Sequence, residues 1–453
     1  MMHDEPYPRL QEPRRRLRRR WILPPAAALG LLAPVGAAHA QYIEQYFPYG
    51  TPGYTDEQGV TVLTRQRPLY ESPGIHLGDF LIRPEWDQGF GYNSNVNGFS
   101  NGPSSTVLNT GGSLSATSLW ARNSFGATFT VNNSRYFDAP AQSYTNWTAS
   151  IGGSYQIGRG NLILGYSHLS LNEIGDEIGA VPSSTPIAYT VDDLRAQYTF
   201  DLGRLSFTPT YDMQYFQFTS ASLAGQTLPQ TYRDRVVSTG GVTTRYALSD
   251  QRNLIFVVEG VDSHYTVPLA GSPTFDSWSA LILGGFDYVA DGPFRYRVLV
   301  GVESRFFSSS SFGSHTAPIV AAEAIWTPTG LTTVTGSLAR TIEDPAAEGT
   351  AGYVYTNARL VVDHELLRNV LLQGRTGYEI ASYLQGGSSQ NAFTVGGGVT
   401  WLLNRNLRLS LDYDFTDQTS GTPTTFNGIP NATTVGTGAF SRNLALLTLR
   451  FAL

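Results

Sequence analysis

The sequence predicts an all-β fold: a transmembrane antiparallel up-and-down β-barrel of about 18 strands, with about 16 as the alternative count. Residues 294–307 and 407–416 carry apolar side chains at every second position and charged ones on the other side. Because side chains along a strand point alternately to opposite faces, each segment forms a strand with one apolar and one charged face. A soluble sandwich turns its polar face outward, whereas a membrane barrel turns its apolar face to lipid.

The connections between these segments are the second observation, because short and long ones take turns from residue 78 onward. Eight short ones lie near 121–123, 158–161, 202–205, 249–253, 290–293, 327–330, 365–369 and 403–406. Nine longer ones, rich in Ser, Thr, Pro, Gly and Asn, lie near 93–105, 138–142, 173–188, 221–230, 266–275, 308–316, 342–351, 385–390 and 418–437. Outer-membrane barrels have short periplasmic turns, longer extracellular loops and an even strand count. A chain of sandwich domains would instead show linkers between domains.

Composition is the third observation. Aromatic residues make up 12% of the chain, charged residues only 15%, and there are 47 Gly and no Cys. The absence of Cys excludes disulfides and thiolate metal sites. No Lys is present, and the chain after residue 40 has 23 Arg against 33 Asp and Glu. A net negative protein without a basic cluster is a poor nucleic-acid partner.

The first forty residues have the features of a secretory signal peptide. An Arg-rich stretch at 14–20 precedes a short apolar run that ends at Ala38-His39-Ala40, a small-residue cleavage site. We expect cleavage after Ala40. The short run contains three Pro and polar sequence follows it, which argues against a membrane anchor. The Arg stretch also resembles a twin-arginine signal, but a chain bound for the outer membrane should be exported unfolded.

The predicted organisation has three parts: a signal peptide at 1–40, a periplasmic segment or plug at 41–77, and the barrel at 78–453. Residues 41–77 are rich in Pro, Gly and Tyr and do not follow the strand rhythm. Two arrangements remain open for this segment. It folds into the bore as a plug or partner-docking arm, or it stays a flexible leader, because chain ends are loose unless other contacts hold them.

Turning the apolar faces outward leaves a set of charged and polar side chains facing the lumen. The candidates for lining the pore are Arg195, Arg233, Arg235, Arg245, Arg295, Arg297, Glu303, Arg305, Glu323, Arg359, Arg375, Glu379, Arg408 and Asp412. The same assignment turns inward Arg83, Glu85, Asp87, Asp193, Gln197, Asp212, Gln214, Thr239, Asn357, Asp363, Gln373, Asp414, Arg442 and Arg450. Burying so many ions in a dry interior would cost several kcal/mol each, so we expect a hydrated lumen.

The inward charges have two interpretations. Arg on one wall and acids on another would create a field that selects solutes by charge. Alternatively, they are neighbours on adjacent strands that neutralise and order the wall, and we favour this structural interpretation for most pairs. Nearly all aromatic residues are expected to point outward, so recognition of solutes by ring stacking is not expected. Two outer girdles are predicted from Trp120, Phe200, Phe294, Trp326 and Trp401 at one end and Tyr92, Tyr136, Tyr215, Tyr265, Phe306 and Phe415 at the other.

The chain has none of the residue groupings that mark a catalytic or metal centre. Glu173, Asp176 and Glu177 lie in one long connection without calcium-loop spacing, and we expect this loop to be solvated. The His residues are scattered, and no Gly-x-Ser-x-Gly or phosphate-binding Gly motif occurs. We therefore predict a protein that is not an enzyme and has no metal and no cofactor.

Residues 61–99 contain motifs of a known family. They are Arg67-Pro68, Gly74-Ile75-His76-Leu77-Gly78-Asp79-Phe80, Pro84, and Tyr92-Asn93-Ser94-Asn95-Val96. In these motifs the chain resembles the putative beta-barrel porin 2 family of bacterial outer-membrane proteins. The resemblance implies an outer-membrane barrel and, for many members, a part in exopolysaccharide or capsule export. The chain departs from the family pattern at Ser94, where an acid is usual, and its end at Leu453 lacks the aromatic residue of many barrels.

These observations together predict a channel in the outer membrane of a Gram-negative bacterium that passes hydrophilic solutes. Export of a polysaccharide with a periplasmic partner is the first hypothesis. A general diffusion porin for small nutrients is the alternative from the same class. A third hypothesis is a plugged barrel that serves as an adhesin or structural anchor. Outer-membrane lipid is the expected environment in every case.

Overall fold

A computed structural model describes residues 46–47, 51–54, 61–181, 183–223, 226–268, 271–288, 292–344, 351–385, 388–419, 424–426, 433–435 and 438–453. The predicted signal peptide at 1–40 lies outside these residues. Within the described part, no helix has the length and apolarity needed to span a membrane.

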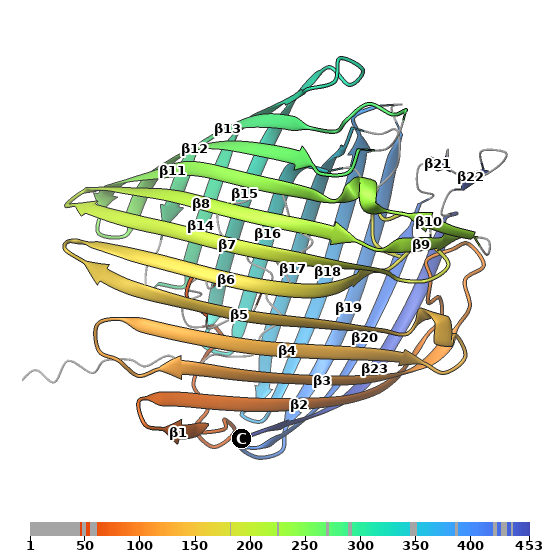
Figure 1. Cartoon of the computed structure of the whole chain (residues 1–453). Helices are drawn as coiled ribbons and strands as arrows, with labels where there is room; N and C mark the ends of the chain where they lie inside the picture. Colours follow the sequence, from red (N-terminus) through yellow and green to blue (C-terminus); the bar gives the residue numbers. More distant parts are fainter. Residues whose placement is uncertain are drawn as a thin grey trace, which may run out of the picture.

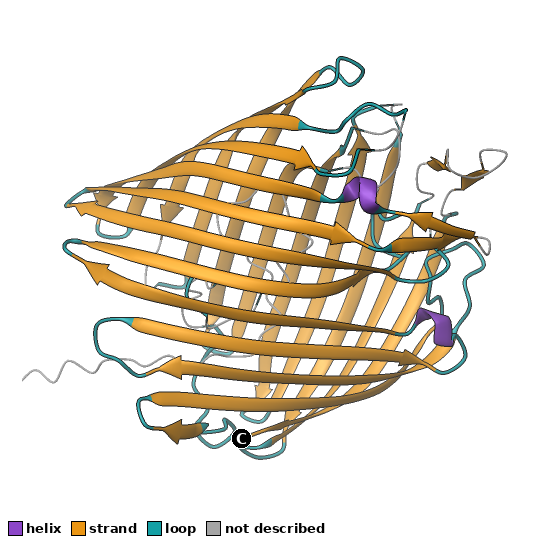
Figure 2. Ribbon diagram, in the orientation of Figure 1, coloured by secondary structure: helices purple, strands orange, loops and turns teal. Residues whose placement is uncertain are grey.

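Eighteen long antiparallel strands form one closed barrel, as the sequence predicted (Figures 1 and 2). They are β2 (Phe80–Asn93), β3 (Ser105–Ser118), β4 (Ser124–Tyr136), β5 (Tyr144–Ile157), β6 (Gly160–Glu173), β7 (Ile187–Leu202), β8 (Leu205–Phe218), β11 (Arg235–Ser249), β12 (Arg252–Tyr265), β13 (Ser277–Tyr288), β14 (Phe294–Phe307), β15 (Ser314–Thr329), β16 (Thr332–Glu343), β17 (Tyr353–Leu367), β18 (Val370–Tyr383), β19 (Ser389–Leu402), β20 (Leu407–Gln418) and β23 (Phe440–Ala452). Each has 12 to 16 residues, enough for a tilted crossing of a bilayer.

The barrel closes where the first long strand meets the last. β2 pairs with β23 from Glu85↔Ala452 to Asn93↔Leu444, and every other long strand pairs with its neighbours in the chain. Closure gives each of the long strands two partners and leaves no open edge in the barrel, which is what a sheet in lipid requires. Figure 1 shows β3 to β8 on the front wall and β15 to β19 on the rear wall.

The connections alternate as predicted. The eight short connections lie at one end of the barrel, which in such barrels is the periplasmic end. The nine longer ones lie at the other, extracellular end, at the right of Figure 1. The remaining elements are β1 (Ile75–Leu77), which pairs with the start of β2, β9 (Ser220–Leu223), β10 (Gln226–Pro229), β21 (Thr424–Phe426), β22 (Thr433–Val435) and the short 3₁₀ helices η1 (Pro140–Gln142) and η2 (Thr231–Arg233).

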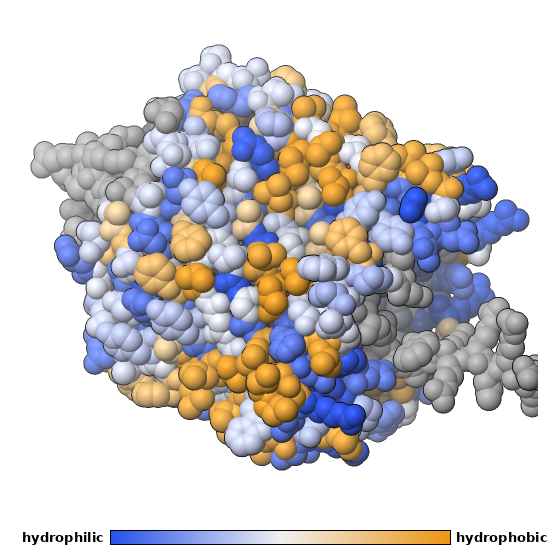
Figure 3. Space-filling model, turned by 180° about the vertical axis from the view of Figure 1, so that it is seen from behind, coloured by the Kyte–Doolittle hydropathy of each residue, from blue (hydrophilic) through white to orange (hydrophobic). Residues whose placement is uncertain are grey.

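The outer surface of the barrel is apolar. On β14, Val298, Val300 and Val302 are 40–54% exposed, whereas Glu303 and Arg305, which point inward, are 0–1% exposed. This is the facing that period-two alternation predicted for residues 294–307. Figure 3 shows such apolar side chains spread over one side of the outer surface. Exposed apolar groups on this scale suit a lipid environment.

The predicted aromatic girdles need one correction. Trp120, Trp326 and Trp401 near the periplasmic end are 46–49% exposed on the outer face. Tyr136 and Tyr265 are only 8% and 4% exposed, because their positions on β4 and β12 belong to the inward set. Each lies at the last position of its strand, where ring type alone does not determine the facing.

Candidate functional site: the lumen of the barrel

Several ion pairs on the inner wall join neighbouring strands. Arg195 on β7 and Asp212 on β8 are register partners, with Nε 2.9 Å from Oδ2. Arg450 on β23 and Asp87 on β2 pair across the closing contact, with Nε 2.6 Å from Oδ1. Pairs of this kind neutralise charge and order the wall.

A second group of ion pairs is centred on a loop carboxylate. Asp344 directly follows β16, and its Oδ2 lies 2.8 Å from Nε of Arg235 on β11. Its Oδ1 lies 2.8 Å from Nη1 of Arg305 on β14, which is almost fully buried. The carboxylate of Asp344 thus links the end of β16 to β11 and β14, which are not neighbouring strands. Sequence reasoning missed Asp344, because it lies in a long connection and only barrel closure brings it near these strands.

Arg375 reaches across a whole strand. From β18 its guanidinium passes over β19 to Asp414 on β20, with Nη2 2.6 Å from Oδ2, and to Asp412, with Nη1 3.3 Å from Oδ1. The strand between them has Gly at 396, 397 and 398. A Cβ at Gly396 would lie 2.0 Å from Oδ1 of Asp414, so this contact depends on glycine.

The other predicted pore-lining residues are spread round the wall. Arg233 lies in η2 rather than in a strand, because the chain turns there before β11 begins, and its Nη2 is 2.5 Å from Oε2 of Glu173. Nη2 of Arg245 on β11 lies 3.2 Å from Oδ2 of Asp287, and Arg297 is the register partner of Glu323. The inward positions of β14, β17 and β18 also include Arg295, Glu303, Arg359 and Glu379. Contact of these side chains with a passing solute stays a prediction.

A long extracellular connection between β6 and β7 extends across the lumen; we call residues 174–181 and 183–186 the cross-lumen loop. Its Gly179 N–H donates to Oε1 of Gln390 on β19, at 3.0 Å, and its Asp176 forms an ion pair with Arg442 on β23. Both strands lie far round the barrel from β6 and β7. The acidic loop is therefore not simply solvated, as the sequence suggested, because the chain folds inward at this point.

In the cross-lumen loop, the carboxyl group of Glu177 has a shifted pKa. Burial raises the pKa of Glu177 well above its ordinary value, the neighbouring carboxylates of Glu173 and Glu379 raise the pKa further, and Arg233 opposes the shift. A carboxyl group in such surroundings favours its protonated form.

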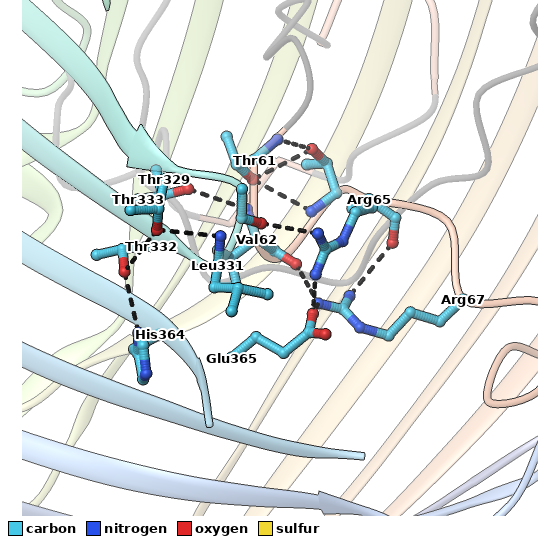
Figure 4. A network of polar contacts seen from close by, with 12 residues as sticks. Thr61, Val62, Arg65, Arg67, Thr329, Leu331, Thr332, Thr333, His364 and Glu365 are labelled. Carbon is cyan, nitrogen blue, oxygen red and sulfur yellow. Dashed lines mark hydrogen bonds and ion pairs between the residues drawn. The ribbon is translucent and has the colours of Figure 1, made fainter. Parts of the chain in front are cut away.

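Parts of the segment at 41–77 contact the inner wall at two places. Residues 51–54 lie against the wall of β4 to β7, where the hydroxyl of Tyr54 donates to Oδ1 of Asp193 at 2.8 Å. Residues 61–67 lie against β16 and β17 near the periplasmic end (Figure 4). Both contacts are made by residues that sequence reasoning placed outside the pore-lining set.

A cavity of about 230 Å³ lies at the periplasmic end, between residues 63–72 and the wall. Four Arg and four acids line it: Arg67, Arg83, Arg408, Arg450, Glu71, Glu85, Asp363 and Asp412. Arg408 and Arg450 face each other as register partners on β20 and β23. Two residues of the predicted pore-lining set, Arg408 and Asp412, thus share one polar cavity.

Comparison with known proteins identifies the family to which the chain belongs. The family model described as putative beta-barrel porin 2 matches residues 67–435. The chain belongs to the putative beta-barrel porin 2 family. This confirms the resemblance that residues 61–99 indicated, and the protein is an outer-membrane β-barrel of the porin type.

Solved structures similar to this porin include OccAB3 of Acinetobacter baumannii, with 9% identity, a TM-score of 0.44 and coverage of 83% of this chain and 100% of that one. OccK2 (OpdF) of Pseudomonas aeruginosa has 11% identity, a TM-score of 0.44 and coverage of 83% and 99%. The FrpB iron transporter of Neisseria meningitidis has 9% identity, a TM-score of 0.41 and coverage of 82% of both chains. No curated protein matches the chain.

The inner wall of this porin also carries apolar and aromatic groups that sequence reasoning missed. Leu281, Leu283 and Leu299 point inward from β13 and β14 and are 0–4% exposed, and Phe216 and Phe218 point inward from β8. The expectation that nearly all rings point outward was therefore wrong. Runs that are apolar at consecutive positions, such as 281–283, are the available signal, because they predict strands covered on both faces.

The porin has no group of three or more His, Asp or Glu side chains among its described residues that is arranged to hold a metal ion. Several acids of the lumen, among them Asp344 and Asp212, instead form ion pairs with guanidinium groups. The chemistry that the wall offers is binding and orientation of polar groups in water.

Proposed function

We propose that this porin passes small hydrophilic solutes across the outer membrane through a hydrated, charged lumen. The observation that carries the proposal is the partial exposure of ion pairs on the inner wall. Arg450 and Asp87 each keep 28% of their side-chain surface exposed, and Arg375 and Asp414 keep 16% and 25%. Charged pairs that face a closed barrel's interior yet remain exposed need water beside them.

The segments that lie inside the bore favour small solutes, rather than a polysaccharide, as the transported molecules. The cross-lumen loop joins distant strands at the extracellular end, and residues 51–54 and 61–67 contact the wall below it. A polymer would have to pass both the cross-lumen loop and these N-terminal residues. Polysaccharide export with a periplasmic partner is supported by the family resemblance alone. Export through a signal peptide cleaved after Ala40 is part of the same proposal.

Reconstitution of the purified protein tests the proposal. We expect discrete conductance steps in a planar bilayer, and swelling of protein-loaded liposomes that slows as the sugar solute grows from a monosaccharide to an oligosaccharide. Liposomes without protein give the baseline. If the protein and all variants described below carry no current, the barrel is an anchor or adhesin instead.

A deletion strain separates uptake from export. Small-solute passage predicts lower permeability to small sugars and an unchanged surface polysaccharide. Loss of surface polysaccharide with unchanged sugar permeability would favour export and contradict the proposal.

A further inference from the structure

The N-terminal part of the chain touches two opposite walls of the lumen. We call the described residues between 46 and 77 the N-terminal strap. Its residues 46–47 and 51–54 contact β4 to β8, and its residues 61–67 contact β16 and β17. β17 is the ninth strand from β6 in either direction round the ring of eighteen, so these two walls face each other. The described parts of the strap are therefore held on two opposite walls of the bore.

The first attachment, which we call the upper clasp, combines rings with an ion pair. Phe47 and Tyr54 stack with their centroids 4.9 Å apart, and the guanidinium of Arg195 lies 4.3 Å and 4.8 Å from the two ring centroids. Tyr54 donates to Asp193, which also pairs with Arg195. Phe47 and Tyr54 are 5% and 7% exposed and pack on inward apolar side chains of the wall, including Leu169. Burial and cation–π contact both hold this end.

The second attachment, the lower clasp, is polar. Arg65 and Arg67 both form ion pairs with Glu365 on β17, and Nη2 of Arg67 lies 2.7 Å from Oε2. The backbone N–H of Val62 donates to Oγ1 of Thr333 on β16, at 3.0 Å (Figure 4). Because Arg67 and Glu365 are only 9% and 8% exposed, breaking this pair leaves charges poorly solvated.

The wall is shaped to the strap. Gly152 on β5 and Gly165 on β6 are register partners beneath it. A Cβ at Gly152 would lie 2.0 Å from the carbonyl oxygen of Pro52, and one at Gly165 would lie 2.7 Å from the ring of Tyr54. Any larger residue at these two wall positions would push the strap away.

The strap is nevertheless held less firmly than a strand. Among the described residues before β1, its backbone–backbone hydrogen bonds are local, such as that from Tyr54 to Thr51 and that from Arg65 to Thr61. Pairing with the barrel begins only at Ile75. Elements held by a few side-chain contacts open at lower free energy than a strand ladder.

We propose that the N-terminal strap is an internal gate of the channel. It obstructs the lumen while both clasps hold, and solutes pass when the strap leaves the wall. This inference rests on the proposed channel function, and the partner it assigns to the lumen wall is the chain's own segment.

A disulfide staple tests the gate in the full-length protein. The chain has no Cys, so Val62→Cys with Thr333→Cys introduces one possible bridge at the lower clasp. We expect the oxidised double variant to lose most of its conductance, and a reducing agent to restore it. Each single variant under the same oxidant is the control. Equal conductance of the oxidised and reduced double variant would overturn the proposal.

A second variant displaces the strap. Gly152→Val should raise the open fraction several-fold, because the added side chain occupies the place of the Pro52 carbonyl. The matched control is Gly284→Val on β13, where a Cβ meets nothing within 4 Å. If the two variants conduct alike, the gate is refuted while the channel stands. If Gly152→Val does not assemble, the staple decides. Absence of current from every form contradicts the channel function itself.

Discussion

At the scale of single residues, the ion pairs of the inner wall depend on the positions of glycine residues as much as on the positions of charged residues. Arg375 makes its contacts with Asp412 and Asp414 only because Gly396 and Gly398 leave room above β19. A guanidinium bound to two carboxylates is a strong, oriented contact. A larger side chain in place of one of these glycines should therefore destabilise the barrel as removal of Arg375 or its carboxylate partner would.

Replacement of Gly396 by Val tests this dependence. The added side chain meets the carboxylate of Asp414 and should destabilise the barrel by roughly 1–3 kcal/mol, the usual effect of overpacking. The measurement is guanidinium unfolding of the protein folded into lipid vesicles. Gly374→Val on β18, where a Cβ meets nothing within 4 Å, is the control. Equal stability of the two variants would show that the contact contributes little.

The outer face gives a second test at the same scale. Val300 is 54% exposed on the lipid side of β14. Val300→Arg should cost roughly 2–4 kcal/mol near the midplane of the bilayer, because the charge must be placed in hydrocarbon. Thermal and guanidinium unfolding in vesicles measure the change, with Val300→Leu as the apolar control. If Val300→Arg inserts and melts like the parent while Glu303→Ala does not, the facing is the reverse of ours.

At the scale of elements, two segments that are not strands lie inside the barrel. The cross-lumen loop is held by Asp176 and Gly179 at the extracellular end, and the N-terminal strap is held by its two clasps. Each of the two segments contacts strands that are distant from one another in the chain. The solute path is therefore set by these segments as well as by the barrel.

The loop should respond to pH through Glu177. Burial raises the pKa of Glu177 in the folded loop above its value in an exposed chain. The loop is then most stable at low pH, where the carboxyl is protonated in both states, and it loses this stability as pH rises through the raised pKa. We expect conductance to increase as the pH rises from about 4, near the pKa of an exposed Glu, through the raised pKa of Glu177, because the loop then loosens. Glu177→Gln should flatten the profile. A decrease with rising pH, or an unchanged profile in the variant, would contradict this assignment.

At the scale of the whole molecule, the sequence was sufficient for the architecture. Alternation along residues 294–307 and 407–416 predicted the facing, and the regular order of short and long connections predicted eighteen strands. These features are local, and each strand repeats them. The physical requirement that a sheet in lipid must close turns such a pattern into one fold.

The interior was predictable only in part, because its contacts join residues far apart in the chain. Arg195 and Asp212 could be paired from adjacent strands, but Asp344 with Arg235 and Glu365 with Arg67 depend on how loops and the N-terminal segment fold inward. The inward position of Leu299 was also missed, because the charged residues of β14 suggested a polar inner face, although the apolar run at 298–300 is a signal of a strand covered on both faces.

The most direct test of the whole account is the water accessibility of single cysteines along β14, in a chain that has no other Cys. The protein is folded into vesicles and treated with a charged, membrane-impermeant thiol reagent. A hydrated lumen inside a lipid-facing barrel predicts labelling of Arg295→Cys and Arg297→Cys, and none of Val298→Cys and Val300→Cys. Labelling that does not alternate, or that alternates in the opposite sense, would contradict it.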